Sequence, residues 1–320
     1  MDEKNKVGIM IKHIRKSKGI TQAELSREGT RGHICTVRNL RKIESGQIEP
    51  NPYVLNQLLS GLGVSPTEFV KMLYGEKMVL FYNQLEVMRN LCFEGKFEQA
   101  EKELEELKDN ELFDRRNPMI KQSLLLHEGI VLKGLHSDYH NCLEKLCQAL
   151  YITCPKMFKK ENKLDTDFIA NNTLTQSEYQ ILMVIANTKG MLGSQNEKIE
   201  ILTAMCSSLS NTKIDSETKY KLLPAIYFNL SNAFLDEGMH EQALKASEEG
   251  IDLCQEGKVF KIYNHLLWNK GAALHNMGDK TQAVEYIHKA YNGFLLHGRS
   301  IHTPEFLKKV AAEEYGIWLD

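Results

Sequence analysis

The sequence has few of the features that mark exported, metal-bound or membrane proteins. Its seven cysteines are an odd number and none forms a CxxC pair, which argues against a disulfide framework and the common zinc sites. Only seven prolines occur in 320 residues, and no apolar run approaches the roughly 20 residues of a membrane span. The opening MDEKNKVGIM lacks the apolar core of a signal peptide. These absences predict a reduced, soluble, cytoplasmic protein.

Catalytic patterns are equally scarce. No nucleophile and base stand at a recognisable spacing, and the acidic run EKELEELKDNE has the pattern of a charged helical face. His136, His140 and Cys142 have no recognisable fourth metal ligand. We therefore expect no enzyme activity, no metal and no other cofactor.

Charge is distributed unevenly along the chain. Residues 1–74 carry 12 Lys and Arg against 7 Asp and Glu, whereas the remaining 246 residues carry 28 against 35. A basic head on an acidic body indicates that the head alone meets a polyanion such as DNA. We predict two domains, a head at 1–74 and a body at 75–320.

The head has the pattern of five short helices. Apolar residues repeat at helical spacing before Gly19, and Thr21 with Glu24 forms the capping-box pattern that starts a second helix. Gly46 ends a third helix in the usual C-terminal role. The helices are expected at about 7–18, 21–26, 36–44, 52–61 and 65–73.

The third of these helices has an apolar face and a basic rim. If Val37, Leu40 and Ile43 face inward, the remaining side chains are those that contact DNA: Arg binds guanine, Asn binds adenine and Lys binds phosphate. We predict that Arg38, Asn39 and Arg41 read bases, and that Lys42, Gln22 and the N-terminal lysines anchor phosphates. The predicted DNA-binding residues are Gln22, Thr36, Arg38, Asn39, Arg41 and Lys42.

The segments RKSKGITQAELS, RKIESG and LLSGLGVSPTEF resemble successive parts of the phage-repressor-type helix-turn-helix, over about residues 7–70. Between Leu25 and Ile43 the chain has about four residues more than the common pattern, which we place in REGTRGH. Either the second helix is longer or the turn is looped out. These alternatives affect the start of the third helix, and so Thr36, more than they affect Arg38 or Arg41.

The body carries an internal repeat. In WNKGAALHNMGDKTQAVEYIHKAY, the residues Gly271, Gly278, Ala283, Ile287 and Ala290 have the spacings of a tetratricopeptide repeat. YFNLSNAFLDEGMHEQALKASEEG has the same intervals, and NLCFEGKFEQAEKELEEL has their second half. The predicted units span roughly 78–109, 118–152, 177–209, 219–255 and 260–297, followed by a capping helix. The polar connector at 159–176 is expected to form a loop or lengthened helix ends.

Such repeats stack into a right-handed superhelix whose first helices line a concave groove. An Asn carboxamide there can both donate to and accept from an extended peptide backbone, although a bridge between helices is an equal alternative. Phe228 and Trp268 would form apolar pockets, and Arg89 or Lys133 would meet a terminal carboxylate. The predicted peptide-binding residues are Arg89, Lys133, Met183, Asn187, Phe228, Asn229, Asn232, Trp268, Asn269 and His275.

Such a head on such an array resembles the Rgg/PlcR-type regulators of the RRNPP superfamily, and HICTVRNLRKIESG is especially similar to the PlcR-like branch. The resemblance implies an all-α cytoplasmic homodimer that binds double-stranded operator DNA with two-fold symmetry. A short signalling peptide in the repeat domain would switch it, as in quorum sensing. Two alternatives remain: an adaptor whose groove holds a partner protein, and an enzyme-inhibiting repeat protein with an idle head.

Overall fold

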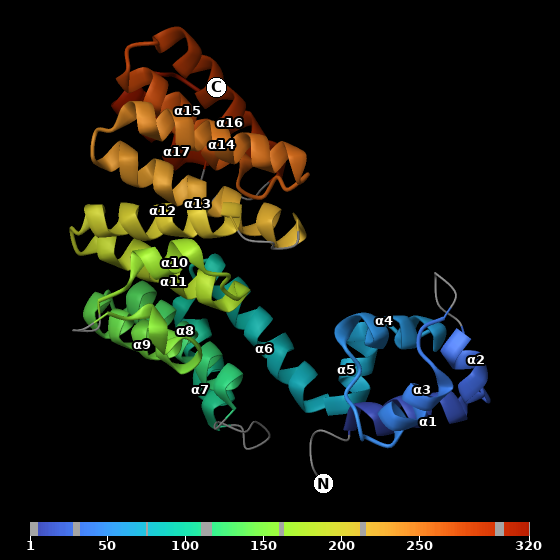
Figure 1. The fold of residues 1–320 in the computed structure, drawn as a ribbon. Helices are drawn as coiled ribbons and strands as arrows, with labels where there is room; N and C mark the ends of the chain where they lie inside the picture. The colour runs from blue at the N-terminus through green and yellow to red at the C-terminus, as the bar shows by residue number, and fades with distance from the viewer. Residues whose placement is uncertain are drawn as a thin grey trace. The chain divides into compact units, whose positions relative to one another are not determined.

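The protein is helical throughout the part of the chain described by the computed structural model, which comprises residues 6–27, 33–74, 76–109, 117–159, 163–211, 216–297 and 304–319 (Figure 1). Within these ranges no strand occurs, and one isolated bridge joins Phe158 and Leu164. No helix in them is both long and apolar enough to cross a bilayer. The chain separates into two compact units, one formed mainly by the first 87 residues and the other by most of the chain from Met88 onward.

The head contains the five predicted helices. A shared apolar core, which includes Ile11, Leu25, Leu40 and Phe69, explains why such short helices are stable. The helices are α1 (Lys6–Ser17), α2 (Gln22–Arg27), α3 (Val37–Glu44), α4 (Pro52–Gly61) and α5 (Pro66–Tyr74).

Local capping fixes where α2 and α3 begin and end. The capping box is confirmed, because the Thr21 backbone N–H donates to the Glu24 carboxylate at 2.7 Å and the Glu24 N–H donates to Thr21 Oγ1 at 3.2 Å. Thr36 is the N-cap of α3, where its hydroxyl accepts from the Asn39 N–H. Gly46 ends α3 with a φ of 72°. The extra residues near 27–33 fall between α2 and α3, and 28–32 lie outside the described residues.

The second unit consists of paired helices. Each predicted repeat corresponds to two successive helices. The first helix of the first repeat, α6, runs through the division between the two units. The pairs are α6 (Glu76–Phe93) with α7 (Phe97–Asp109), α8 (Pro118–Leu135) with α9 (Tyr139–Thr153), α11 (Gln176–Met191) with α12 (Gln195–Asn211), α13 (Ser216–Asp236) with α14 (His240–Glu256), and α15 (Tyr263–Asn276) with α16 (Lys280–His297). The predicted capping helix is α17 (Pro304–Tyr315).

Small residues let the paired helices approach closely. Ser231 and Ser247, on α13 and α14, are fully buried and their hydroxyl oxygens lie 2.7 Å apart. A Cβ added at Gly271 would lie 2.6 Å from Ile287 Cγ1, so a larger residue there would push α15 and α16 apart. Gly278, with a φ of 93°, makes the turn between them. The spacing of small residues therefore predicted the packing correctly.

The connector between the second and third pairs is more ordered than expected. It contains a 3₁₀ turn (Pro155–Met157) and a short helix, α10 (Thr166–Asn171), which packs against α12. Ile169 on α10 is fully buried, and Ser208 Oγ on α12 donates to the Asn172 carbonyl at 2.6 Å. The polar composition of the segment gives no apolar helical pattern, so the sequence did not predict this helix. One buried apolar side chain and the caps of the helix are enough to hold it.

Candidate functional site

The α3 helix presents a polar, basic surface. Leu40 and Ile43 are buried in the head core, whereas Arg38, Asn39 and Arg41 are exposed. Three side chains with the hydrogen-bonding groups that recognise base edges therefore share the outer face of one short helix. Of the other predicted contacts, Thr36 is exposed beside them and Lys42 is half-buried.

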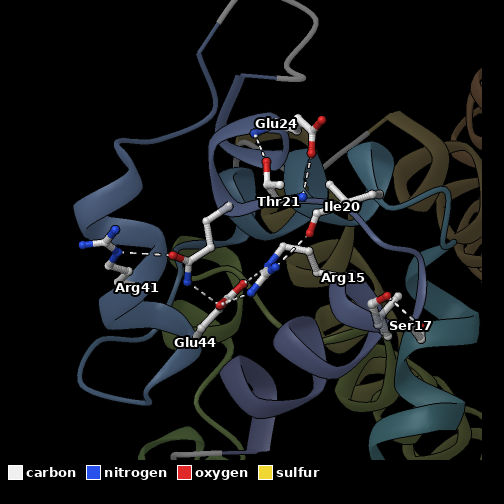
Figure 2. Close-up of polar contacts among 9 residues, drawn as sticks. Arg15, Ser17, Ile20, Thr21, Glu24, Arg41 and Glu44 are labelled. Atoms are coloured by element: carbon white, nitrogen blue, oxygen red, sulfur yellow. Dashed lines mark hydrogen bonds and ion pairs between the residues drawn. The ribbon is translucent and has the colours of Figure 1, made fainter.

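A buried ion pair holds α3 against α1. Arg15 Nε lies 2.6 Å from Glu44 Oε1, and Arg15 Nη2 donates to Glu44 Oε2 at 2.8 Å (Figure 2). Arg15 Nη1 donates to the carbonyl of Ile20, just before α2. Although burial opposes the charge, hydrogen bonds from Arg15 and Gln22 lower the pKa of Glu44 below its ordinary value. One bidentate pair thus fixes three helices relative to one another.

Gln22 connects the Arg15–Glu44 ion pair to the outer face of α3. Its Nε2 donates to Glu44 Oε2 at 2.7 Å, and its Oε1 accepts from Arg41 Nε at 3.2 Å. Figure 2 shows the resulting series of contacts from Arg15 through Glu44 to Arg41. The amide of Gln22, predicted as a phosphate anchor, is therefore already engaged in orienting Arg41.

A cavity of about 740 Å³ lies within the repeat domain. Its walls come from the fourth and fifth pairs, from α12 and from the capping helix α17. Aromatic rings form much of its wall, and its charged and amide groups are carboxamides, one ammonium and two carboxylates. The lining residues include Lys198, Phe228, Asn232, Asp236, His265, Trp268, Asn269, Ala272, Asn276, Phe294, Phe306, Leu307, Glu314 and Tyr315.

Four of the predicted peptide-binding residues meet in this cavity: Phe228, Asn232, Trp268 and Asn269. Asn269 is 5% exposed and its Nδ2 donates to Asn232 Oδ1 at 2.7 Å. The two carboxamides therefore bridge α13 and α15 and line the cavity at the same time. The alternatives drawn from the sequence, groove contact and inter-helix bridge, coexist at these positions.

The other six predicted residues do not line this cavity. Asn229 Nδ2 donates to the Ala225 carbonyl at 2.7 Å and contacts Met183 Sδ at 3.5 Å, as an inter-helix bridge does. The His275 ring stacks edge-on against Tyr315, 5.3 Å between centroids, just behind the cavity wall. The remaining three lie on the first helices of the first three pairs: Arg89, Lys133 and Asn187.

The sequence did not predict several of the residues that line the cavity. His265 is buried between Phe228 and Phe294, with ring centroids 5.3 and 4.8 Å away. Tyr315 comes from the capping helix and stacks on Trp268, and burial raises its pKa. The repeat spacing does not mark the position of His265 as groove-facing, although this residue lies on α15, the first helix of its pair. Lining residues supplied by second helices or by the capping helix carry no repeat signal at all.

Comparison with known proteins identifies both parts of the chain. A helix-turn-helix family model matches residues 11–69, and a tetratricopeptide-repeat model matches residues 224–256 and 265–292. The repeat model thus recognises the fourth and fifth pairs, which build most of the cavity. No curated protein matches the sequence.

Solved structures match almost the whole length. They include Bacillus thuringiensis PlcR in complex with the peptide PapR7 and DNA, which is 18% identical with a TM-score of 0.69 and coverage of 97% of this chain and 99% of that one. A variant of the SHP pheromone receptor Rgg2 from Streptococcus dysgalactiae is 15% identical with a TM-score of 0.60 and coverage of 97% and 99%.

A third structure, ComR from S. thermophilus in complex with DNA and its signalling peptide ComS, is 14% identical with a TM-score of 0.51 and coverage of 97% and 100%. At these identities the likeness concerns the fold. This protein therefore carries a helix-turn-helix domain followed by tetratricopeptide repeats, in the fold of PlcR, Rgg2 and ComR, as its resemblance to Rgg/PlcR-type regulators implied.

Proposed function

We propose that this protein is a cytoplasmic, peptide-sensing transcriptional regulator and not an enzyme. It binds operator DNA as a homodimer through α3, and a short signalling peptide in the repeat-domain cavity switches that binding. The observation that carries the proposal is the outer face of α3. There three side chains suited to base edges are exposed, while the buried inner face and the Arg15–Glu44 pair hold the helix against α1.

Rigid presentation supports a role in sequence reading. A guanidinium discriminates guanine by two simultaneous hydrogen bonds, so its orientation must be fixed before the complex forms. The Gln22 contact restrains Arg41 through Nε, the atom that such a bidentate contact does not require. Two copies of α3 in a dimer would address a two-fold symmetric operator.

The cavity supports a peptide as the effector. Its volume is that of small-ligand sites, and aromatic walls with a few carboxamides suit a short peptide better than a highly charged metabolite. The solved structures of PlcR and ComR, which share this fold, contain both a peptide and DNA. A peptide that binds one arrangement of the dimer better than another would shift the population and change DNA affinity.

The DNA-binding half is tested by selecting fragments of the source genome on the full-length protein across a salt series. Recovery of a few fragments that share a two-fold symmetric sequence is expected. The double variant Arg38→Ala/Arg41→Ala should recover none of them. Recovery of all fragments alike, fading uniformly with salt, would show a merely basic surface and would favour the adaptor alternative.

A further inference from the structure

Lys198 is a buried cation in the wall of the repeat-domain cavity. It belongs to α12, a second helix, and its side chain is only 10% exposed. The closest carboxylate oxygen, Asp236 Oδ2, lies 3.9 Å from Nζ, beyond hydrogen-bonding distance. Among the described residues no group forms a hydrogen bond with this ammonium. Burial lowers the pKa of Lys198, and the charge of Asp236 opposes that shift only in part.

Lys270 shows how the same chain treats another buried lysine. Its side chain is 14% exposed, a similar burial, but its Nζ lies 2.8 Å from Glu248 Oε1. The ammonium also lies 4.3 Å from the centroid of the Tyr286 ring. Burial opposes the charge here too, yet the contacts with Glu248 and Tyr286 raise the pKa of Lys270. Buried charges in proteins are normally paired in this way, so Lys198 is the exception.

The surroundings of Lys198 have further unused hydrogen-bonding capacity. Gln195, one turn earlier on α12, donates weakly to Asp236, but its buried Oε1 has no donor. Gly190 on α11 makes room for both side chains, because a Cβ there would lie 2.7 Å from Lys198 Cδ and 3.1 Å from Gln195 Oε1. Lys198 therefore lines the aromatic cavity as an unused donor, and the packing against Gly190 places the unpaired oxygen of Gln195 near its side chain.

We propose that Lys198 binds a carboxylate of the peptide that occupies the cavity. The inference rests on the proposed function and specifies its ligand: a short peptide that places an apolar or aromatic side chain near Phe228 and Trp268 and a carboxylate at Lys198. The carboxylate belongs either to an acidic side chain or to the peptide's C-terminus. Sequence-based prediction missed Lys198, which belongs to a second helix.

The first test is the stability of the ligand-free protein. Lys198→Met removes an unpaired buried charge, so the melting temperature of the repeat domain should rise by about 2–4 °C. Lys270→Met breaks a satisfied pair and leaves Glu248 alone, so it should lower the melting temperature. A fall in Lys198→Met would mean that its contact with Asp236 supports the fold, and it would overturn the proposal.

The second test uses immobilised full-length protein and mixed-sequence heptapeptides. Four libraries are compared, with a free or amidated C-terminus and with Asp and Glu either present or replaced by Asn and Gln. Retained peptides are quantified by mass spectrometry. Libraries that carry the required carboxylate should be retained about 10–100-fold better than their neutral counterparts. Lys198→Met should lose this preference and Lys270→Met should keep it.

The four libraries separate the sources of the carboxylate. Loss of retention on amidation assigns the contact to the C-terminus, and loss on replacement of Asp and Glu assigns it to a side chain. Retention that is equal in all four, or unchanged in Lys198→Met, overturns the inference but leaves peptide binding established. No retained peptide from any library would overturn both the inference and the proposed function.

Discussion

The head network around Glu44 and the cavity wall around Lys198 treat their buried polar groups in opposite ways. In the head, Arg15, Glu44 and Gln22 form one connected network in which each side chain is bonded. At the cavity wall Lys198 forms no hydrogen bond with a described residue, and behind it the buried Oε1 atom of Gln195 has none either. The paired groups of the head support the DNA-reading surface proposed for α3, whereas the unpaired ammonium of Lys198 is available to the peptide proposed for the cavity.

Breaking the head network should have the largest effect. Arg15→Met leaves the Glu44 carboxylate buried without its partner, which should cost about 3–5 kcal/mol and unfold the head. Urea unfolding of the full-length protein, followed by circular dichroism, should then show an early loss of part of the helical signal. The double variant Arg15→Met/Glu44→Leu removes both charges and should recover most of the stability. If the single variant were as stable as the wild type, the pair would not hold α1 and α3 together.

The outer face of α3 should affect DNA affinity and leave the fold intact. Replacing both Arg38 and Arg41 by Ala should weaken specific binding by about 10²–10⁴-fold, because each bidentate base contact is worth about 1–3 kcal/mol. Lys42→Ala should weaken all sequences alike and reduce the salt dependence. Fluorescence anisotropy with a selected fragment and a scrambled one separates these effects. Equal losses on both fragments in the double variant would assign the two arginines to phosphates.

Gln22 allows a test of whether the head network affects DNA binding through Arg41. Gln22→Ala should lower specific affinity by about 10-fold, since it releases Arg41 and removes one bond to Glu44. If Gln22 acts through Arg41, the effect should vanish in an Arg41→Ala background, as a double-mutant cycle measures. Additive losses would restore the role of phosphate anchor that its sequence position suggested.

The two regions should also respond to opposite ends of the pH scale. The pKa of Glu44 is lowered in the folded head, so its stabilisation is complete above the ordinary value of 4.5 and is lost as pH falls below it. The pKa of Lys198 is lowered from 10.5, so the destabilising contribution of its buried charge diminishes as pH rises toward 10.5. The first dependence should be weaker in Glu44→Gln and the second weaker in Lys198→Met. Denaturant titrations at several pH values check both, and a wild-type profile retained by either variant would contradict that assignment.

Local sequence signals predicted the helices, the caps and the pairing of the repeats. Thr21 with Glu24, and the small residues around Gly271, act within one turn or one helix pair, so their spacing alone specifies the structure. The Gln22–Glu44 contact joins residues 22 positions apart and required the folded head to be seen. The positions of Lys198 and Tyr315 in the cavity wall also could not be predicted from the sequence. Only the stacking of the helix pairs brings a second helix and the capping helix to the cavity.

The most direct test of the account is the coupling between the two regions. The affinity for a selected DNA fragment would be measured with and without a peptide retained by the repeat domain, and the affinity for that peptide with and without the fragment. A peptide-gated regulator must give the same factor in both directions, by linkage, and a value of about 5–150-fold is expected. A factor of one in both directions would mean that peptide binding in the repeat-domain cavity and DNA binding by the head are independent, and the regulator proposal would fail.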